Sequence, residues 1–92
     1  VLFFDADPLT PQAQAEVMRD MPERHRFLYL RKGTGSTLTA IEAAPLKARY
    51  GSLRELADAD NQDMAAIFGV RALEWDLVGQ ANAILNILNG GS

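Results

Sequence analysis

The sequence predicts an all-α domain of five to six short helices, and three kinds of observation lead to this prediction. Residues that favour the start of a helix stand directly before runs of good helix formers, at Thr10, Ser52 and Asp60. Apolar residues recur at helical spacing through residues 72–89. A glycine hinge separates the last two helical segments. The chain has 92 residues, which suffice for a modest core, so we expect one small domain over residues 1–92.

The N-terminal residues 1–10 are predicted to form an arm that leads into the first helix. The segment VLFFD at residues 1–5 is apolar and rich in strand formers, so it is either a short strand or a hydrophobic arm packed on the core. Thr10 is a good N-cap, and Pro11 fits the first helical position, where no backbone N–H is needed. We therefore expect the first helix over residues 12–20.

The segment 24–32 is compatible with two structures. Its aromatic and aliphatic side chains alternate as in a strand, whereas Pro22 before it and Gly33 after it suit the ends of a helix. We favour the helix, because the rest of the chain is helical and a lone strand has no pairing partner. The next loop, GTGS at residues 33–36, lacks the Lys-Ser/Thr pair of a P-loop. We interpret it as a helix C-cap followed by an N-cap at Ser36.

The central residues are predicted to form further short helices. One begins at Thr37, and Pro45 must break, kink or restart it, because proline lacks the N–H that a helix interior requires. The chain continues through residues 46–50, and Ser52 then caps a helix over residues 53–57, with an acid at its third position.

A hinge follows the next helix. Asp60 caps residues 62–68, and Gly69 ends that helix and turns the chain toward another. We therefore expect a positive φ at Gly69, a conformation that glycine adopts without steric cost.

The last helix is predicted over residues 72–89. Its main apolar stripe consists of Leu73, Leu77, Ile84 and Leu88, and its polar face carries Asn82, Asn86 and Asn89. So wide an apolar surface belongs either to the central helix of the core or to an oligomer interface, and the small size of the chain favours the core. On the inner faces around the hinge we expect three large side chains to be largely buried: Phe68, Trp75 and Leu77.

The composition indicates an ordinary folded domain. Apolar residues make up 48% of the chain and charged residues 23%, and no apolar run is long enough to span a bilayer. The chain has no Cys, which excludes disulfides, thiolate metal sites and Cys nucleophiles and fits a cytoplasmic protein. We expect residues 90–92 to be a flexible tail, and the chain to be an excised domain or a processed product.

Charge is unevenly distributed. The net charge of −3 argues mildly against a nucleic-acid partner. However, residues 24–32, which we name the basic segment, contain no acid and carry four cations, Arg24, Arg26, Arg31 and Lys32. This segment is either a solvated helix face or a contact surface for phosphates.

Residues 46–70, LKARYGSLRELADADNQDMAAIFGV, resemble helix-hairpin-helix domains, in particular the tandem domain at the N-terminus of RadC-type proteins. RYGSL at residues 49–53 matches the family's Arg-aromatic-Gly-Ser-Leu element, and IFGV at residues 67–70 matches most of its Ile-x-Gly-hydrophobic-Gly hairpin. A Gly-Thr-Gly loop at residues 33–35 also fits. The likeness covers roughly residues 28–88 and implies one or two helix-hairpin-helix-like units.

In this family the hairpin donates backbone N–H groups to a phosphate. The resemblance therefore implies that Gly69, Val70 and Arg71 contact nucleic acid. The chain departs from the family at two positions, because Arg71 replaces the second hairpin glycine and Phe68 replaces the usual proline. Arg71 either obstructs the approach of the phosphate or supplies a cation to it.

A helix-turn-helix is the alternative for the same segment. Ala65 would be the small residue at the helix crossing, Gly69 would lie in the turn, and the buried positions would be Met64, Phe68, Val70, Trp75 and Val78. The recognition helix would then open at Arg71 and carry two acids, Glu74 and Asp76, which repel the DNA backbone. We rank this function below the hairpin.

An enzyme is the third alternative, and the sequence shows no catalytic constellation. His25 is the single histidine and lies between two arginines, a setting typical of a surface. Asp5 and Asp7 are placed like strand-end Mg²⁺ ligands, but no further ligands follow, and Asp7 is better explained by the helix start at Pro8. We expect no enzyme activity, no metal and no cofactor.

These observations predict a non-catalytic recognition module. The first choice of partner is nucleic acid, contacted through Arg24, Arg26, Arg31, Lys32, Gly69, Val70 and Arg71. The alternative is a protein-interaction or oligomerisation module on the same helical architecture, with self-association through the C-terminal helix. No membrane contact is expected.

Overall fold

The computed structural model describes residues 10–33 and 35–90, and it confirms the mostly helical fold class. The helices are α1 (Pro11–Arg19), α2 (Glu23–Arg26), α3 (Ala40–Arg49), α4 (Leu53–Ala57), α5 (Asn61–Phe68) and α6 (Leu77–Leu88). Two 3₁₀ helices, η1 (Phe27–Tyr29) and η2 (Val70–Glu74), and a hairpin of β1 (Arg31–Lys32) and β2 (Ser36–Thr37) complete the fold. The strand or arm predicted at residues 1–5 and the tail predicted at residues 90–92 fall wholly or partly outside the described residues.

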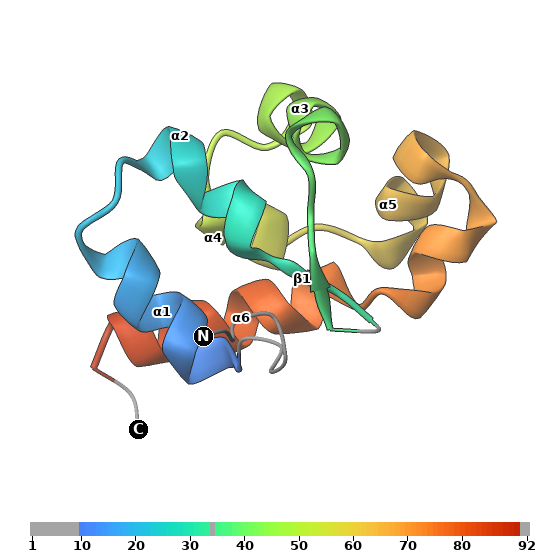
Figure 1. Ribbon diagram of the computed structural model, residues 1–92. Coiled ribbons are helices and arrows are strands. Elements are labelled where there is room, and N and C mark those ends of the chain that lie inside the picture. The colour runs from blue at the N-terminus through green and yellow to red at the C-terminus, as the bar shows by residue number, and fades with distance from the viewer. Residues whose placement is uncertain (1–9, 34, 91–92) are drawn as a thin grey trace, which may run out of the picture.

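Helix α6 is the centre of the core. It packs mainly against α4 and α1, as Figure 1 shows, and it buries Leu77, Ala81 and Ile84. Its opposite face carries Asn82, Asn86 and Asn89, all exposed, so the predicted polar face is confirmed. The apolar face of α6 thus belongs to the core of the domain, as the short chain length favoured.

The predicted N-caps of three helices are confirmed. The Thr10 hydroxyl accepts from the Ala13 N–H, and Pro11 occupies the first turn of α1. Ser52 accepts from the Glu55 N–H at the start of α4, and Asp60 accepts from a backbone N–H at the start of α5. Each bond satisfies a donor that a helix N-terminus would otherwise leave open.

The basic segment is part helix and part strand. It is helical through α2 and η1, but β1 follows and pairs antiparallel with β2, Arg31 opposite Thr37 and Lys32 opposite Ser36. The turn closes through a bond from the Gly35 N–H to the Lys32 carbonyl oxygen, 2.7 Å, and Gly35 has a φ of +96°. The interpretation of residues 33–36 as two helix caps is therefore wrong, because the loop supplies β1 with a partner.

Helix α3 begins later than predicted and runs through Pro45. Thr39 is its N-cap and forms a reciprocal capping box with Glu42, so the helix begins at Ala40 rather than Thr37. Pro45 lies inside the helix and does not end it. We attribute this to the capping box before Pro45 and to the buried Leu46 after it, which stabilise the helix on both sides.

The hinge at Gly69 is confirmed, but the helix predicted over residues 72–89 is divided. Gly69 has a φ of +94°, and the chain then forms η2 instead of the start of a long α-helix. Asp76 adopts a left-handed conformation with a φ of 49°, and its carboxylate accepts from the Gly79 N–H to cap α6. A cap at Asp76 restarts the chain as a separate helix.

The burial predicted around the hinge is only partly confirmed. Leu77 is buried, whereas Phe68 and Trp75 are half-buried and pack at the edge of the core. Their ring centroids are 5.2 Å apart with the planes tilted by 54°. This arrangement is favourable for two aromatic rings and leaves part of each ring in contact with solvent.

Candidate recognition site at the Val70–Glu74 helix

The cations of the basic segment do not form one surface. Arg24 is exposed, and Arg26 lies 3.9 Å from the Glu23 carboxylate on α2. Arg31 and Lys32 are half-buried on β1. In Figure 1, α2 lies on the far side of the hairpin from α5 and the orange segment of η2, so Arg24 and Arg26 are remote from the hinge.

Lys32 is a structural cation. Its Nζ donates to both carboxylate oxygens of Glu42, at 3.0 and 3.1 Å, and so connects β1 to α3. The same carboxylate accepts from the backbone N–H of Thr39. The Thr39 N–H and then the Lys32 ammonium hold the pKa of Glu42 below its usual value. Lys32 is therefore engaged within the domain and contributes little free charge to the surface.

The first glycine turn identified in the sequence packs on the short helix that follows the hinge. Gly33, at the tip of the hairpin, lies against the end of η2. A Cβ built on Gly33 would lie 2.1 Å from the carbonyl oxygen of Glu74 and 3.2 Å from the Cα of Trp75. Only glycine permits this approach of one backbone to another. The hairpin tip is therefore seated on η2, although the two are about 40 residues apart in the sequence.

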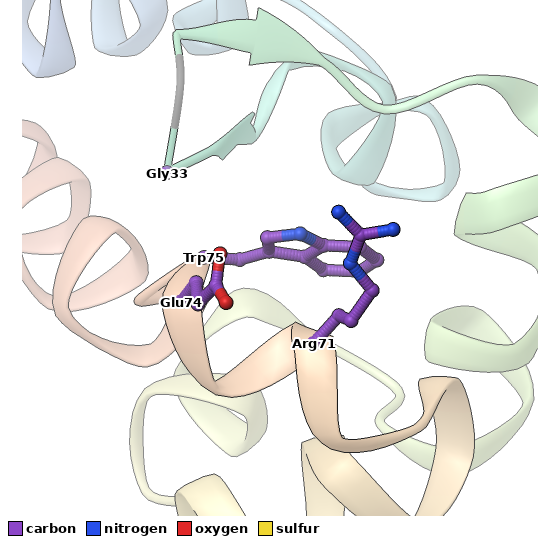
Figure 2. Close-up of a pocket in the computed structure, with 4 residues that line it drawn as sticks. All are labelled: Gly33, Arg71, Glu74 and Trp75. Atoms are coloured by element: carbon purple, nitrogen blue, oxygen red, sulfur yellow. The ribbon is translucent and has the colours of Figure 1, made fainter.

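A hollow of about 420 Å³ lies where these segments meet. The described residues that line it are Gly33, Arg71, Glu74 and Trp75. Figure 2 shows the Arg71 side chain rising from η2 beside the Trp75 ring, with Gly33 on the opposite side. Of these residues, Arg71 belongs to the predicted site, whereas the roles of Gly33, Glu74 and Trp75 were not predicted.

The 3₁₀ geometry of η2 divides its side chains among three faces. In a 3₁₀ helix, residues three apart lie above one another. Ala72 faces the interior and is buried. Val70 and Leu73 form an outward apolar ridge with exposures of 76% and 42%, and we name this pair the ridge. Arg71 and Glu74 form the face that lines the hollow.

The two charges of the hollow are not paired. Both side chains are exposed, and neither forms an ion pair or a side-chain hydrogen bond with any residue that the structure describes. Other charged side chains of the domain do form ion pairs, such as Arg49 with Asp63 at 3.4 Å. Arg71 and Glu74 thus present an unpaired cation and an unpaired anion to the hollow, toward opposite ends of the Trp75 ring (Figure 2).

The helix-turn-helix interpretation is wrong in two respects. It requires Val70 to be buried, but this side chain is 76% exposed. It also requires a recognition helix that opens at Arg71, but η2 ends at Glu74 and the chain turns through Asp76 before α6 begins. No α-helix long enough to read a groove therefore starts at the hinge.

No cluster of three or more metal-ligating side chains occurs within residues 10–33 and 35–90. His25 is exposed on α2, and Asp5 and Asp7 lie outside the described residues. Within the same part of the chain, none of the helices has the length and apolar character that crossing a membrane requires.

Comparison of the chain with family models, with curated proteins and with solved structures finds no match.

Proposed function

We propose that the chain is a non-catalytic recognition module that binds a protein partner through η2. The observation that carries this proposal is that the ridge and the hollow lie next to each other on η2. Val70 and Leu73 are two exposed apolar side chains on one short helix, and an arginine, a glutamate and a tryptophan lie directly beside them. A small apolar centre with charged and aromatic side chains around it is the arrangement of a protein interface.

The composition of this surface favours a protein over nucleic acid. Arginine and tryptophan are enriched at the centres of protein interfaces. The residues that contribute most to the binding free energy of such interfaces are often arginines and tryptophans. The single cation of the hollow is balanced by Glu74, and Lys32 is already bound to Glu42. A phosphate backbone, in contrast, requires several unbalanced cations.

The test is selection of peptide ligands on the intact chain. A random peptide library is displayed against the immobilised protein, and selected peptides are measured on Val70→Asp and on Ile41→Asp. Ile41 is the matched control, because it is an aliphatic side chain with 86% exposure on α3, outside η2 and the residues that line the hollow. We expect affinity to fall at least about tenfold on Val70→Asp, as for a central interface residue. Equal binding to both variants, or no selected peptide, would contradict the proposal.

Nucleic-acid contact is a second candidate, and one observation favours it. Gly33 follows the basic segment directly and lines the same hollow as Arg71, so one end of that segment lies beside η2. Together with the helix-hairpin-helix resemblance, this supports Arg31 and Arg71 as candidate cations for contact with a phosphate backbone.

Fluorescence anisotropy with duplex and single-stranded DNA at low salt tests this second candidate. Backbone contact predicts weak, sequence-independent binding that falls steeply as salt rises. Arg31→Glu combined with Arg71→Glu should abolish it, while Arg54→Glu, an exposed cation on α4, serves as the control. Absence of binding by the wild-type chain at high protein concentration would exclude nucleic acid as the partner.

A further inference from the structure

We infer that the partner of the η2 surface is a second copy of this chain, bound about a twofold axis. This inference rests on the proposed function, because it names the protein that η2 recognises. A twofold interface requires a self-complementary surface, in which residue i of one copy meets residue j of the other and j meets i. The η2 surface meets this requirement in both charge and shape.

Arg71 and Glu74 give the η2 surface complementary charges. They are three residues apart on a 3₁₀ helix, so they lie on one face, and both are exposed without an ion-pair partner among the described residues. If two copies of η2 lie antiparallel, Arg71 of each copy faces Glu74 of the other. The interface then gains two ion pairs, and no like charges are brought together by this face.

The ridge and the hollow give the η2 surface complementary shapes. The ridge of Val70 and Leu73 projects from η2, and the hollow opens beside it between Gly33 and Trp75. In the twofold arrangement, Leu73 of the second copy enters this hollow and contacts the ring of Trp75. The reciprocal contact forms at the same time, so two exposed ridges are removed from water.

The small size of the η2 surface indicates a weak dimer. Stable interfaces bury about 1,200–2,000 Å² in total, and a five-residue helix with one hairpin tip lies at or below the lower end of this range. We therefore expect a weak, reversible dimer that forms between about 10 μM and 1 mM. Monomer and dimer should exchange quickly, because weak complexes dissociate fast.

Charge reversal tests the geometry directly. Sedimentation equilibrium is recorded across that concentration range for the wild-type chain, for Arg71→Glu, for Glu74→Arg, for an equimolar mixture of these two variants, and for the double variant. Each single variant places like charges opposite each other twice, so its dissociation constant should rise at least about tenfold. The mixture should form a heterodimer and the double variant a homodimer, because both restore opposite charges.

Trp75 supplies an independent readout, since it is the single tryptophan of the chain. Its emission should shift to shorter wavelength as the wild-type concentration rises, because Leu73 of the second copy excludes water from the ring. The control Ile41→Asp should retain the wild-type dissociation constant. Circular dichroism confirms that each variant is folded, and recovery in the mixture cannot arise from unfolding.

The outcomes separate this inference from the proposed function. A wild-type chain that stays monomeric up to 1 mM overturns the inference, and selected peptides that still depend on Val70 would leave the proposed function intact. A dimer that forms equally well with Arg71→Glu, or a mixture that stays monomeric, overturns the twofold geometry. Dimers in the mixture but not in the single variants support the inference.

Discussion

Replacement of Gly33 by Ala is the most direct test of how the site is built. The added Cβ would lie 2.1 Å from the Glu74 carbonyl oxygen, well inside the separation that real Cβ atoms show. The obstacle is backbone, not the end of a flexible side chain, so the hairpin tip or η2 must move. Overpacking of this kind costs about 1–3 kcal/mol.

A smaller effect opposes this loss. Replacing glycine by alanine restricts the unfolded chain and stabilises the native state by about 0.4–1 kcal/mol where the site tolerates it. We therefore expect Gly33→Ala to lower the free energy of unfolding by a net amount of roughly 1–2 kcal/mol. For a domain of this size, that corresponds to a fall in Tm of roughly 4–16 °C.

Thermal unfolding followed by circular dichroism measures this difference, and Trp75 fluorescence reports the local change. Gly51→Ala is the matched control, because the Cβ there would meet only the end of the Glu55 side chain, which can rotate away. Its Tm should change little, within the usual ±0.5 kcal/mol or so of a surface substitution. If Gly33→Ala melts at or above the wild-type temperature with unchanged fluorescence, the hairpin tip is not seated on η2 and the hollow is not a formed site.

Three further predictions test the connections around the site. In the folded state the pKa of Glu42 lies below its usual value, so the stability that this carboxylate contributes is present at neutral pH and is lost as the pH falls through the folded-state pKa. When the free energy of unfolding is measured between pH 7 and pH 2, Glu42→Gln should make its dependence on pH weaker at the acidic end. Phe68→Ala should lower the free energy of unfolding measured in urea by about 1–2 kcal/mol, because the ring is half-buried against Trp75, whereas Leu53→Ala, at a fully buried position, should lower it by about 2–5 kcal/mol. Equal losses would mean that Phe68 belongs to the main core. Gly69→Val should cost about 1–3 kcal/mol through strain at a φ of +94°, and a wild-type Tm would show that the hinge can relax.

The starts of α1, α4 and α5 were predicted well because their causes are local. Thr10, Ser52 and Asp60 each accept a hydrogen bond from a backbone N–H two or three residues ahead, so the whole interaction is contained in a few letters of sequence. The same holds for Gly69, whose positive φ follows from its place between two helices.

The errors arose where a local pattern had two solutions. Residues 24–32 were compatible with a helix or a strand, and the helix was favoured because no pairing partner was foreseen. The partner is β2, and its pairing with β1 forms a hairpin that the ion pair from Lys32 to Glu42 connects to α3. The long C-terminal helix was divided because Asp76 has a carboxylate that can cap, which periodicity alone does not reveal.

The candidate site was predicted at the hinge but not at the hairpin. Arg71 was singled out because it replaces a glycine in a known motif, and a sequence can show that. Gly33, Glu74 and Trp75 join it only because the hairpin tip packs on η2. A contact between segments about 40 residues apart produces no repeating pattern of residues in the sequence, so it cannot be predicted from periodicity.

The contact between Gly33 and η2 connects stability to recognition. The hollow exists only while the hairpin tip is held against Glu74 and Trp75, so a ligand that fills the hollow binds the native state and not the unfolded chain. Mass action then requires the ligand to raise the free energy of unfolding, by about 1.4 kcal/mol when its free concentration is ten times its dissociation constant. If the ligand is a second copy of the chain, Tm must rise with protein concentration, and Arg71→Glu must remove that dependence without lowering the Tm measured in dilute solution. A concentration-dependent Tm that survives Arg71→Glu would place the self-association on another surface.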